Sequence, residues 1–203
     1  MENVNFVNMH RYQDIERILY RAVKDGEPKV VIELGHGSGA LTSAIGLALR
    51  DVDKNGKLYS YDINGNSNYP LGGNTVSALQ NVQERNLTDI VTFISGDVFN
   101  TWVRDPHPFD LLLIDIDNTW DTIYNIIIAN SFINTQVLNG AKVLIEGGDP
   151  GHPRINHNTL NTFNNTSFLE NKIYINSTGE AVFNITHLGG SGRTSISALE
   201  LVD

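Results

Sequence analysis

The chain has 203 residues, no cysteine and a formal net charge of −9, from 14 basic and 23 acidic side chains. This length suits one domain with a sizeable apolar core, and the lack of cysteine excludes disulfides, zinc–thiolate sites and thiol nucleophiles. The acidic balance, with lysines and arginines scattered singly, argues against a nucleic-acid partner.

No apolar run approaches the ~20 residues that a membrane-spanning helix needs, so we expect no membrane partner. The first residues lack the basic start and apolar stretch of a signal peptide, and we therefore expect a cytoplasmic protein. Four Asn-x-Ser/Thr sequons are then expected to carry no glycan: Asn86, Asn165, Asn176 and Asn184.

Helical and strand patterns alternate from the N-terminus onward. Residues 12–23 carry apolar side chains at helical spacing, and residues 29–34 form a β-branched run typical of a strand buried on both faces. Three glycines follow, and residues 40–49 predict a helix whose N-terminus adjoins them. Further strands are predicted at 57–62, 90–94, 109–115 and 141–146, with a loop at 63–74 and helices at 75–85 and 120–132.

The last third of the chain has a different pattern. Helical signal is weak between residues 155 and 168, whereas residues 182–188 and 195–202 predict two strands joined by a glycine-rich segment. A short glycine connection indicates an antiparallel hairpin. Alternating strands and helices before it indicate a mostly parallel α/β sheet, and without a linker or repeat we expect a single domain over residues 1–203.

Five predicted strands end in an acid at or just past the last apolar position. Only 23 of 203 residues are acidic, so five acids at five strand ends exceed what chance would place there. In an open parallel sheet the carboxyl ends of the strands share one edge, where ligands bind. The five acids are Glu33, Asp62, Asp97, Asp115 and Glu146.

A glycine triplet, Gly35, Gly37 and Gly39, separates the first predicted strand from the helix at 40–49. Without Cβ atoms, this backbone can approach a ligand closely, although tight strand-to-helix turns also use glycine for steric reasons alone. Glu33 lies two residues before the first glycine and would repel the pyrophosphate of a dinucleotide. The turn therefore favours a cofactor that is not a dinucleotide.

The run Glu-Leu-Gly-His-Gly-Ser-Gly at 33–39 resembles the first motif of class I S-adenosylmethionine-dependent methyltransferases, acid-x-Gly-x-Gly-x-Gly. Asp62, ending Tyr-Ser-Tyr-Asp, resembles the acid that this family places on the ribose hydroxyls. Asp97, in Ser-Gly-Asp-Val, resembles its acidic position near the adenine amine. Segments 109–115 and 138–145 resemble the fourth-strand and fifth-strand motifs, so the similarity spans about residues 29–146.

The resemblance implies a Rossmann-like, mostly parallel seven-stranded sheet with helices on both faces and an antiparallel C-terminal hairpin. It implies methyl transfer to a small-molecule acceptor, at oxygen rather than nitrogen, with the oligomeric state open. A metal-dependent hydroxylase-like relative and a catalytically silent S-adenosylmethionine-binding domain are the alternatives on the same fold. The implied cofactor, S-adenosylmethionine, would be held by Glu33, Gly35, Gly37, Gly39, Asp62 and Asp97.

Asp115 and His152 are the candidate catalytic residues, since transfer requires alignment and deprotonation of the acceptor. Catechol-type members of the family place a metal-binding Asp where Asp115 stands and an Asp-Asn pair on the fifth strand. This chain reads Glu146-Gly147 there, so we favour metal-free transfer over a divalent cation on Asp115, Glu146 and Asp117. The structural alternatives are that Asp115 caps the next helix and that His152 is an ordinary loop residue.

Overall fold

The computed structural model describes residues 4–7, 13–52, 55–65, 68–71, 74–116, 122, 124–128, 130–147, 172–174, 181–191 and 194–201. The chain divides into two compact units, residues 1–111 and residues 112–203. Each unit has its own set of neighbouring strands, and the single domain expected over the whole chain stays a prediction.

The first unit is built on three parallel strands in the order β5-β2-β1. β1 (Val30–Leu34) pairs with β2 (Lys57–Asp62), and β2 pairs with β5 (Val91–Ser95). The strands predicted at 29–34, 57–62 and 90–94 are thus confirmed within a residue. Because the three strands run the same way, their carboxyl ends lie at one edge of the sheet.

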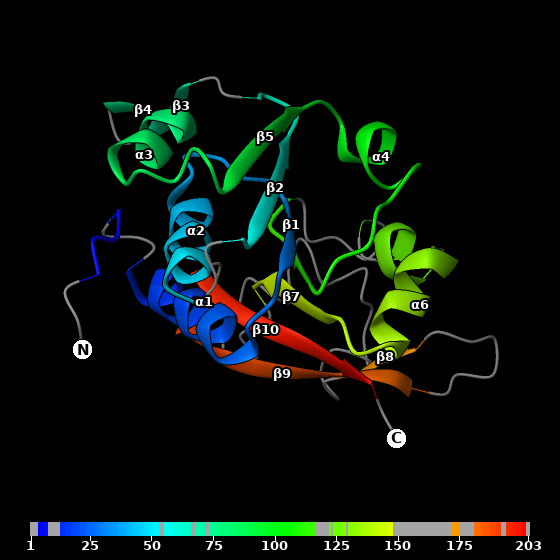
Figure 1. Ribbon diagram of the computed structural model, residues 1–203. Coiled ribbons are helices and arrows are strands. Elements are labelled where there is room, and N and C mark those ends of the chain that lie inside the picture. Colours follow the sequence, from blue (N-terminus) through cyan, green and yellow to red (C-terminus); the bar gives the residue numbers. More distant parts are fainter. Residues whose placement is uncertain are drawn as a thin grey trace. The chain divides into compact units, whose positions relative to one another are not determined.

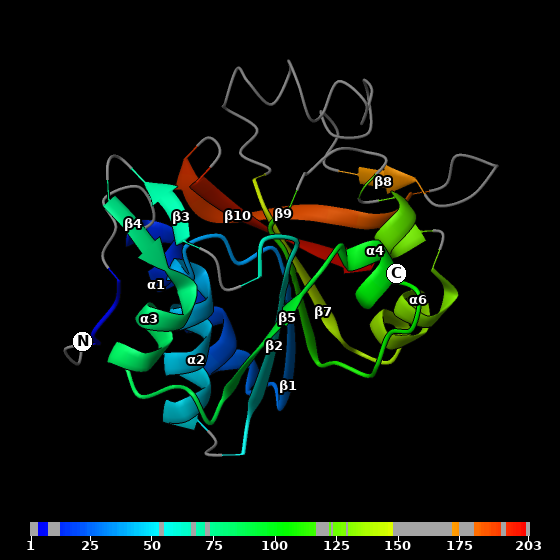
Figure 2. The same cartoon turned by 90° about the horizontal axis from the view of Figure 1, so that it is seen from above.

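Helices cover both faces of these three strands. Figures 1 and 2 show α1 (Gln13–Gly26), α2 (Ala40–Val52) and α3 (Ala78–Glu84) on one side and the short α4 (Val98–Thr101) on the other. Ten consecutive residues of α2, from 40 to 49, are buried. A helix that is buried on all faces must pack against other elements on opposite sides. α2 does so, because it contacts both α1 and β2.

The predicted loop at 63–74 and the predicted helix start at residue 75 are wrong. The chain forms an antiparallel hairpin there, from β3 (Asn68–Leu71) and β4 (Asn74–Ser77). The pair Thr75-Val76 is β-branched and favours an extended backbone. Ser77 then accepts the Gln80 N–H as the N-cap, so the helix begins only at the next residue.

The second unit has the strand order β6-β7-β10-β9-β8. β10 (Thr194–Leu201) runs antiparallel to β7 (Lys142–Glu146) and to β9 (Ala181–Ser191), which confirms the predicted C-terminal hairpin. β6 (Leu111–Ile114) is the predicted fourth strand. The three-residue edge strand β8 (Lys172–Tyr174) was not expected, being too short to show a pattern.

The helix predicted at 120–132 is divided. A π-helical turn, η1 (Tyr124–Ile128), precedes α6 (Ser131–Leu138). Asn130 separates them because its side-chain oxygen accepts the N–H groups of Phe132 and Ile133, at 3.1 and 3.3 Å, as the N-cap of α6. Across the described ranges, no helix is long and apolar enough to span a membrane.

Candidate functional site

The carboxyl ends of β1, β2 and β5 are joined by backbone hydrogen bonds. Gly35, which follows β1, donates its N–H to Tyr61 O at 2.7 Å. Gly96, which follows β5, donates to Asp62 O at 3.0 Å. Three of the predicted strand-end acids, Glu33, Asp62 and Asp97, therefore belong to one connected edge of the first unit.

The three glycines of the turn have positive φ angles, 88° at Gly35, 47° at Gly37 and 78° at Gly39. Their surroundings differ. A Cβ on Gly39 would lie 2.8 Å from the Cα of Ala78, so this glycine is needed where α3 approaches. A Cβ on Gly37 would meet no atom of the described residues within 4 Å. The turn is therefore packed against α3 at one glycine and faces open space at another.

Asp62 ends β2 and holds the glycine turn. Its Oδ2 accepts the N–H groups of His36 and Gly37, both at 3.1 Å, and its Oδ1 accepts the Asn64 N–H at 2.8 Å. An ionised carboxylate offers about four acceptor positions, so Oδ1 retains capacity for a ligand hydroxyl. Asp62 therefore fixes the backbone of the turn, and its contact with a ribose stays a prediction.

Glu33 is completely buried on β1. Its Oε2 accepts the hydroxyls of Ser60 at 2.5 Å and Thr42 at 2.7 Å, while its Oε1 is buried with no hydrogen-bond partner among the described residues. Burial raises the pKa of Glu33 to about 7, against the lowering effect of the two hydroxyls, and the charge of Asp62 adds to the rise. An unpartnered carboxylate oxygen in such a place suits a cation.

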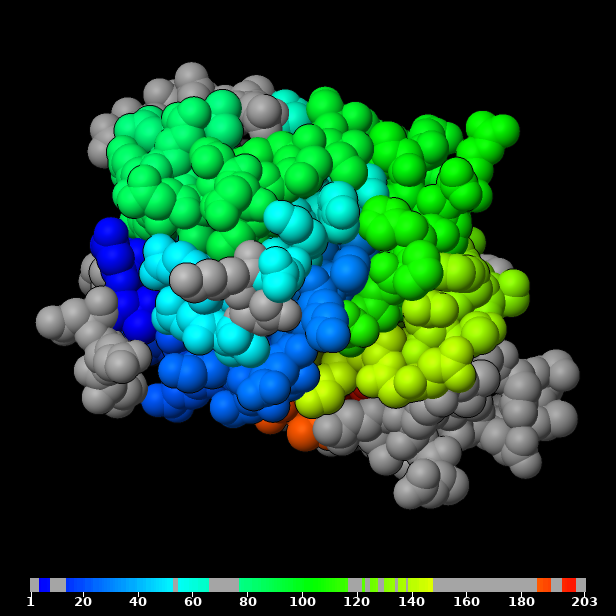
Figure 3. Space-filling view, viewed as in Figure 1, coloured from blue at the N-terminus to red at the C-terminus, as the bar shows by residue number. Residues whose placement is uncertain are grey.

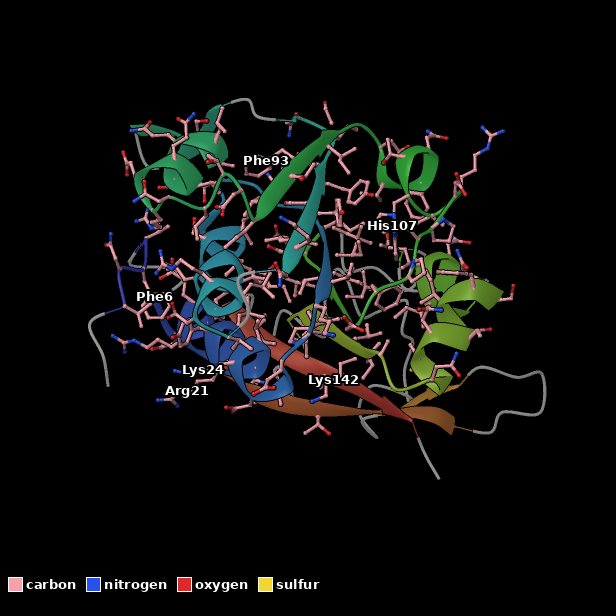
Figure 4. All side chains as sticks on the ribbon, viewed as in Figure 1. Phe6, Arg21, Lys24, Phe93, His107 and Lys142 are labelled. Carbon is pink, nitrogen blue, oxygen red and sulfur yellow. The ribbon has the colours of Figure 1, made fainter. Side chains whose placement is uncertain are left out.

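His36, inside the turn, is a buried packing residue. Its ring meets Phe93 of β5, which is labelled in Figure 4, edge-on, with the centroids 4.8 Å apart. Burial lowers the pKa of His36, and this outweighs the opposing effect of Asp62, whose Oδ2 lies 3.9 Å from the His36 Nδ1. A neutral imidazole beside the turn is consistent with packing or cofactor contact.

Asp97 lies next to Asp62 through the Gly96 hydrogen bond, but its carboxylate is engaged by α4. Oδ1 accepts the Phe99 N–H at 3.0 Å and Oδ2 accepts the Asn100 Nδ2 at 3.1 Å. This is helix capping, the structural use of an aspartate in this position. A contact of Asp97 with adenine stays a prediction.

The other candidates belong to the second unit. Asp115 directly follows β6 and Glu146 ends β7, and β6 and β7 are neighbours, as predicted for a carboxylate pair. Within the ranges that the structure describes, no three His, Cys, Asp or Glu side chains are grouped to hold a metal. Asp117 and His152 lie outside the described residues, so neither the three-carboxylate set nor the proposed histidine is tested.

Three polar residues near the turn were missed from the sequence: Thr42, Ser60 and Asn81. Ser60 is paired with Glu33 by the strand register, and Thr42 reaches it from the first turn of α2. Asn81 of α3 donates its Nδ2 to Ser38 O at 2.8 Å. Only the strand register and helix packing bring them to the turn, and the sequence does not display either.

Residues 32–131 match the family model described as "Methyltransferase domain". The matched segment is 100 of the 203 residues and contains the glycine turn, Asp62 and Asp97. No curated protein matches the sequence. The family match agrees with the resemblance to methyltransferases seen in the sequence, and the chain is also similar to solved structures.

One such structure is the O-methyltransferase TomG from Streptomyces achromogenes, solved in complex with SAM, with a TM-score of 0.58 and 14% identity over 94% of this chain and 80% of TomG. Another is an O-methyltransferase from Bacillus cereus in complex with SAH, with a TM-score of 0.59 and 16% identity over 92% of this chain and 80% of the other. SAH-bound PaMTH1 from Podospora anserina gives a TM-score of 0.58 and 14% identity over 98% and 83%. These likenesses confirm the Rossmann-like fold of the chain.

Proposed function

We propose that the methyltransferase domain binds S-adenosylmethionine at the glycine turn and transfers its methyl group to an oxygen of a small-molecule acceptor. The observation that carries the proposal is the open space at Gly37, with the carboxylates of Glu33 and Asp62 on either side of the turn. The O-methyltransferases TomG and that of Bacillus cereus, solved with SAM and SAH, support both the cofactor and the acceptor atom.

The residues around the turn fit this cofactor group by group. The buried, unpartnered Oε1 of Glu33 suits the ammonium of the methionyl part, and the remaining acceptor capacity of Asp62 suits the vicinal ribose hydroxyls. Ile63 is 71% exposed directly after Asp62 and offers an apolar contact for a flat base. When bound, the cofactor supplies an electrophilic methyl group on a sulfonium.

The protein must then align the acceptor and take up its proton. Asp115 is partly exposed after β6, where a carboxylate can receive a proton, and His152 is the alternative proton acceptor. We favour metal-free transfer because Glu146-Gly147 stands where catechol-type relatives have Asp-Asn. Full activity in the presence of a chelator is the expected result, and activity lost to chelator and restored by magnesium would overturn this preference.

Calorimetric titration with S-adenosylmethionine tests the cofactor, with Asp62→Asn as the informative variant. The amide cannot accept hydrogen bonds at every position where the carboxylate does, so we expect affinity to fall by ~1–3 kcal/mol. Asp89→Asn is the matched control, because Asp89 is exposed beside the start of β2, at the opposite end of the strands. No binding to the unmodified chain would refute the proposed function, and binding without product from any acceptor extract would favour the silent domain.

A further inference from the structure

The glycine turn is buttressed by α3. Ala78 lies so close to Gly39 that a Cβ there would approach its Cα to 2.8 Å, and Asn81, one turn further along the helix, donates its Nδ2 to Ser38 O at 2.8 Å. Both Ser38 and Asn81 are buried. The peptide between the two positive-φ glycines, Gly37 and Gly39, is thus tied to a helix that contributes no residue of the glycine motif.

Arg85 determines which way the Asn81 amide points. Its Nη1 donates to Asn81 O at 2.9 Å and to Asn81 Oδ1 at 3.5 Å. A guanidinium only donates hydrogen bonds, so it holds the amide oxygen on its own side and leaves the Nδ2 for the Ser38 carbonyl. With the amide flipped, its Nδ2 would face the Arg85 guanidinium, donor against donor. Its Oδ1 would face the Ser38 carbonyl, acceptor against acceptor.

The same guanidinium also holds the N-terminal segment 4–7. Its Nε donates to Asn5 O at 3.0 Å and its Nη2 to Phe6 O at 3.2 Å. Figure 3 shows this segment, in dark blue, against the surface of α3, and Phe6 meets the Tyr20 ring of α1 edge-on. Arg85 is therefore fixed from several directions, and it can orient Asn81 without moving itself.

We propose that Asn81 is a positioning residue for cofactor binding. It holds the Ser38 carbonyl, and through it the backbone of the glycine turn, in the conformation that leaves Gly37 facing open space, and Arg85 keeps its amide in the required orientation. The proposal rests on the binding of S-adenosylmethionine at this turn. Without the Asn81 donor, the buried Ser38 carbonyl loses this hydrogen bond, and the turn relaxes at a cost to ligand affinity.

Asn81→Asp separates positioning from packing. The carboxylate keeps the shape and the contact with Arg85, but it removes the donor, adds a negative charge and places an oxygen against Ser38 O. We expect the dissociation constant for S-adenosylmethionine to rise about tenfold and the melting temperature of the free protein to fall, because two buried oxygen atoms then face each other. Gln83→Glu is the matched control, because it makes the same amide-to-acid change at an exposed position of α3 and should leave affinity unchanged.

Two measurements decide the matter. Calorimetry gives the dissociation constant, and amide hydrogen exchange in the free protein reports the turn itself, where the Gly37 and Gly39 N–H groups should exchange faster in Asn81→Asp than in Gln83→Glu. If Asn81→Asp does not fold, Arg85→Lys takes its place, with an expected loss of about threefold, because a lysine cannot donate to Asn81 and to both N-terminal carbonyls at once.

Unchanged affinity and unchanged exchange in the folded variant would overturn the positioning role of Asn81. An equal loss of affinity in Gln83→Glu would overturn it too, because the effect would then be one of charge on α3. If the unmodified chain itself does not bind S-adenosylmethionine, the proposed function fails, and the exchange measurement still decides whether Asn81 holds the turn.

Discussion

Glu33 places a carboxyl group where the folded chain favours the protonated form. Burial raises its pKa from 4.5 to about 7, so between these values the unfolded chain loses a proton that the folded chain keeps. The free energy of unfolding must then fall as the pH rises through this window, by up to ~1.4 kcal/mol per pH unit from this residue. Its contribution is fully present below pH 4.5 and lost above pH 7.

Glu33→Gln should remove that dependence. The variant has no proton to lose and keeps a side chain able to bond Ser60 and Thr42, so we expect it to be more stable than the unmodified chain at pH 8, by on the order of 3 kcal/mol, and similar near pH 4.5. Urea unfolding at both pH values measures the difference. Glu27→Gln, at an exposed position, is the control, and equal pH slopes in Glu33→Gln and Glu27→Gln would contradict the prediction.

Single residues show what the sequence could predict about the site and what it could not. The motif placed Glu33, the glycines and Asp62 correctly at the strand ends, because their spacing relative to the strands is local, and their part in cofactor binding stays a prediction. The partners that give these residues their properties were not predictable, since Ser60 meets Glu33 across a strand register and Asn81 meets Ser38 across 43 residues. Asp97 shows a further limit, because the sequence alone does not distinguish a helix cap, which the structure shows, from a ligand contact, which stays a prediction.

At the scale of elements, the packing of α3 against the glycine turn separates two glycines that look alike in the sequence. Gly37 and Gly39 both have positive φ, so an alanine at either carries the strain of a left-handed backbone, roughly 1 kcal/mol. Only at Gly39 does the added Cβ also collide with Ala78. The collision is with backbone, so α3 must shift to relieve it.

We therefore expect Gly39→Ala to lower the free energy of unfolding by ~2–4 kcal/mol and Gly37→Ala by ~1 kcal/mol. Thermal or urea unfolding of the free proteins measures both losses. Gly37→Ala should also weaken cofactor binding, since its methyl group occupies the open space, and titration with the cofactor measures this loss. Equal losses of stability in the two variants would contradict the prediction, because they would mean that α3 shifts away from the added Cβ at Gly39 with no loss of free energy.

Strands were predicted more closely than helices, for a physical reason. Buried strands such as β6 and β7 are nearly continuous apolar runs, which a sequence shows directly. The hairpin β3–β4 lies in a segment rich in Asn, Gly and Pro, whose local preference is for turns, and only the pairing of the two strands makes it regular. The helix expected at 120–132 was interrupted by a cap, Asn130, placed among apolar residues.

On the scale of the whole molecule, we propose that residues 1–203 form one domain. The boundary between the two compact units falls between Leu111 and Leu112, inside β6, and a strand is not divided between independently folding bodies. We expect calorimetry to show a single unfolding transition whose calorimetric and van't Hoff enthalpies agree. Two separate transitions, or a stable proteolytic fragment ending near residue 111, would contradict the proposal.

The hairpin β3–β4 has a consequence for how this chain tolerates changes in length. The hairpin lies in the segment that connects Asp62 to α3, and its ladder pairs Asn68 with Ser77. This pairing sets the spacing between the turn after Asp62 and the start of α3. Residues added between β3 and β4 would lengthen only the tip of the hairpin, and doubling a loop costs about 0.6 kcal/mol in closure entropy. An inserted peptide tag at this tip would leave Asp62 and Asn81 where they are, which makes the hairpin a natural attachment point for a reporter of cofactor binding.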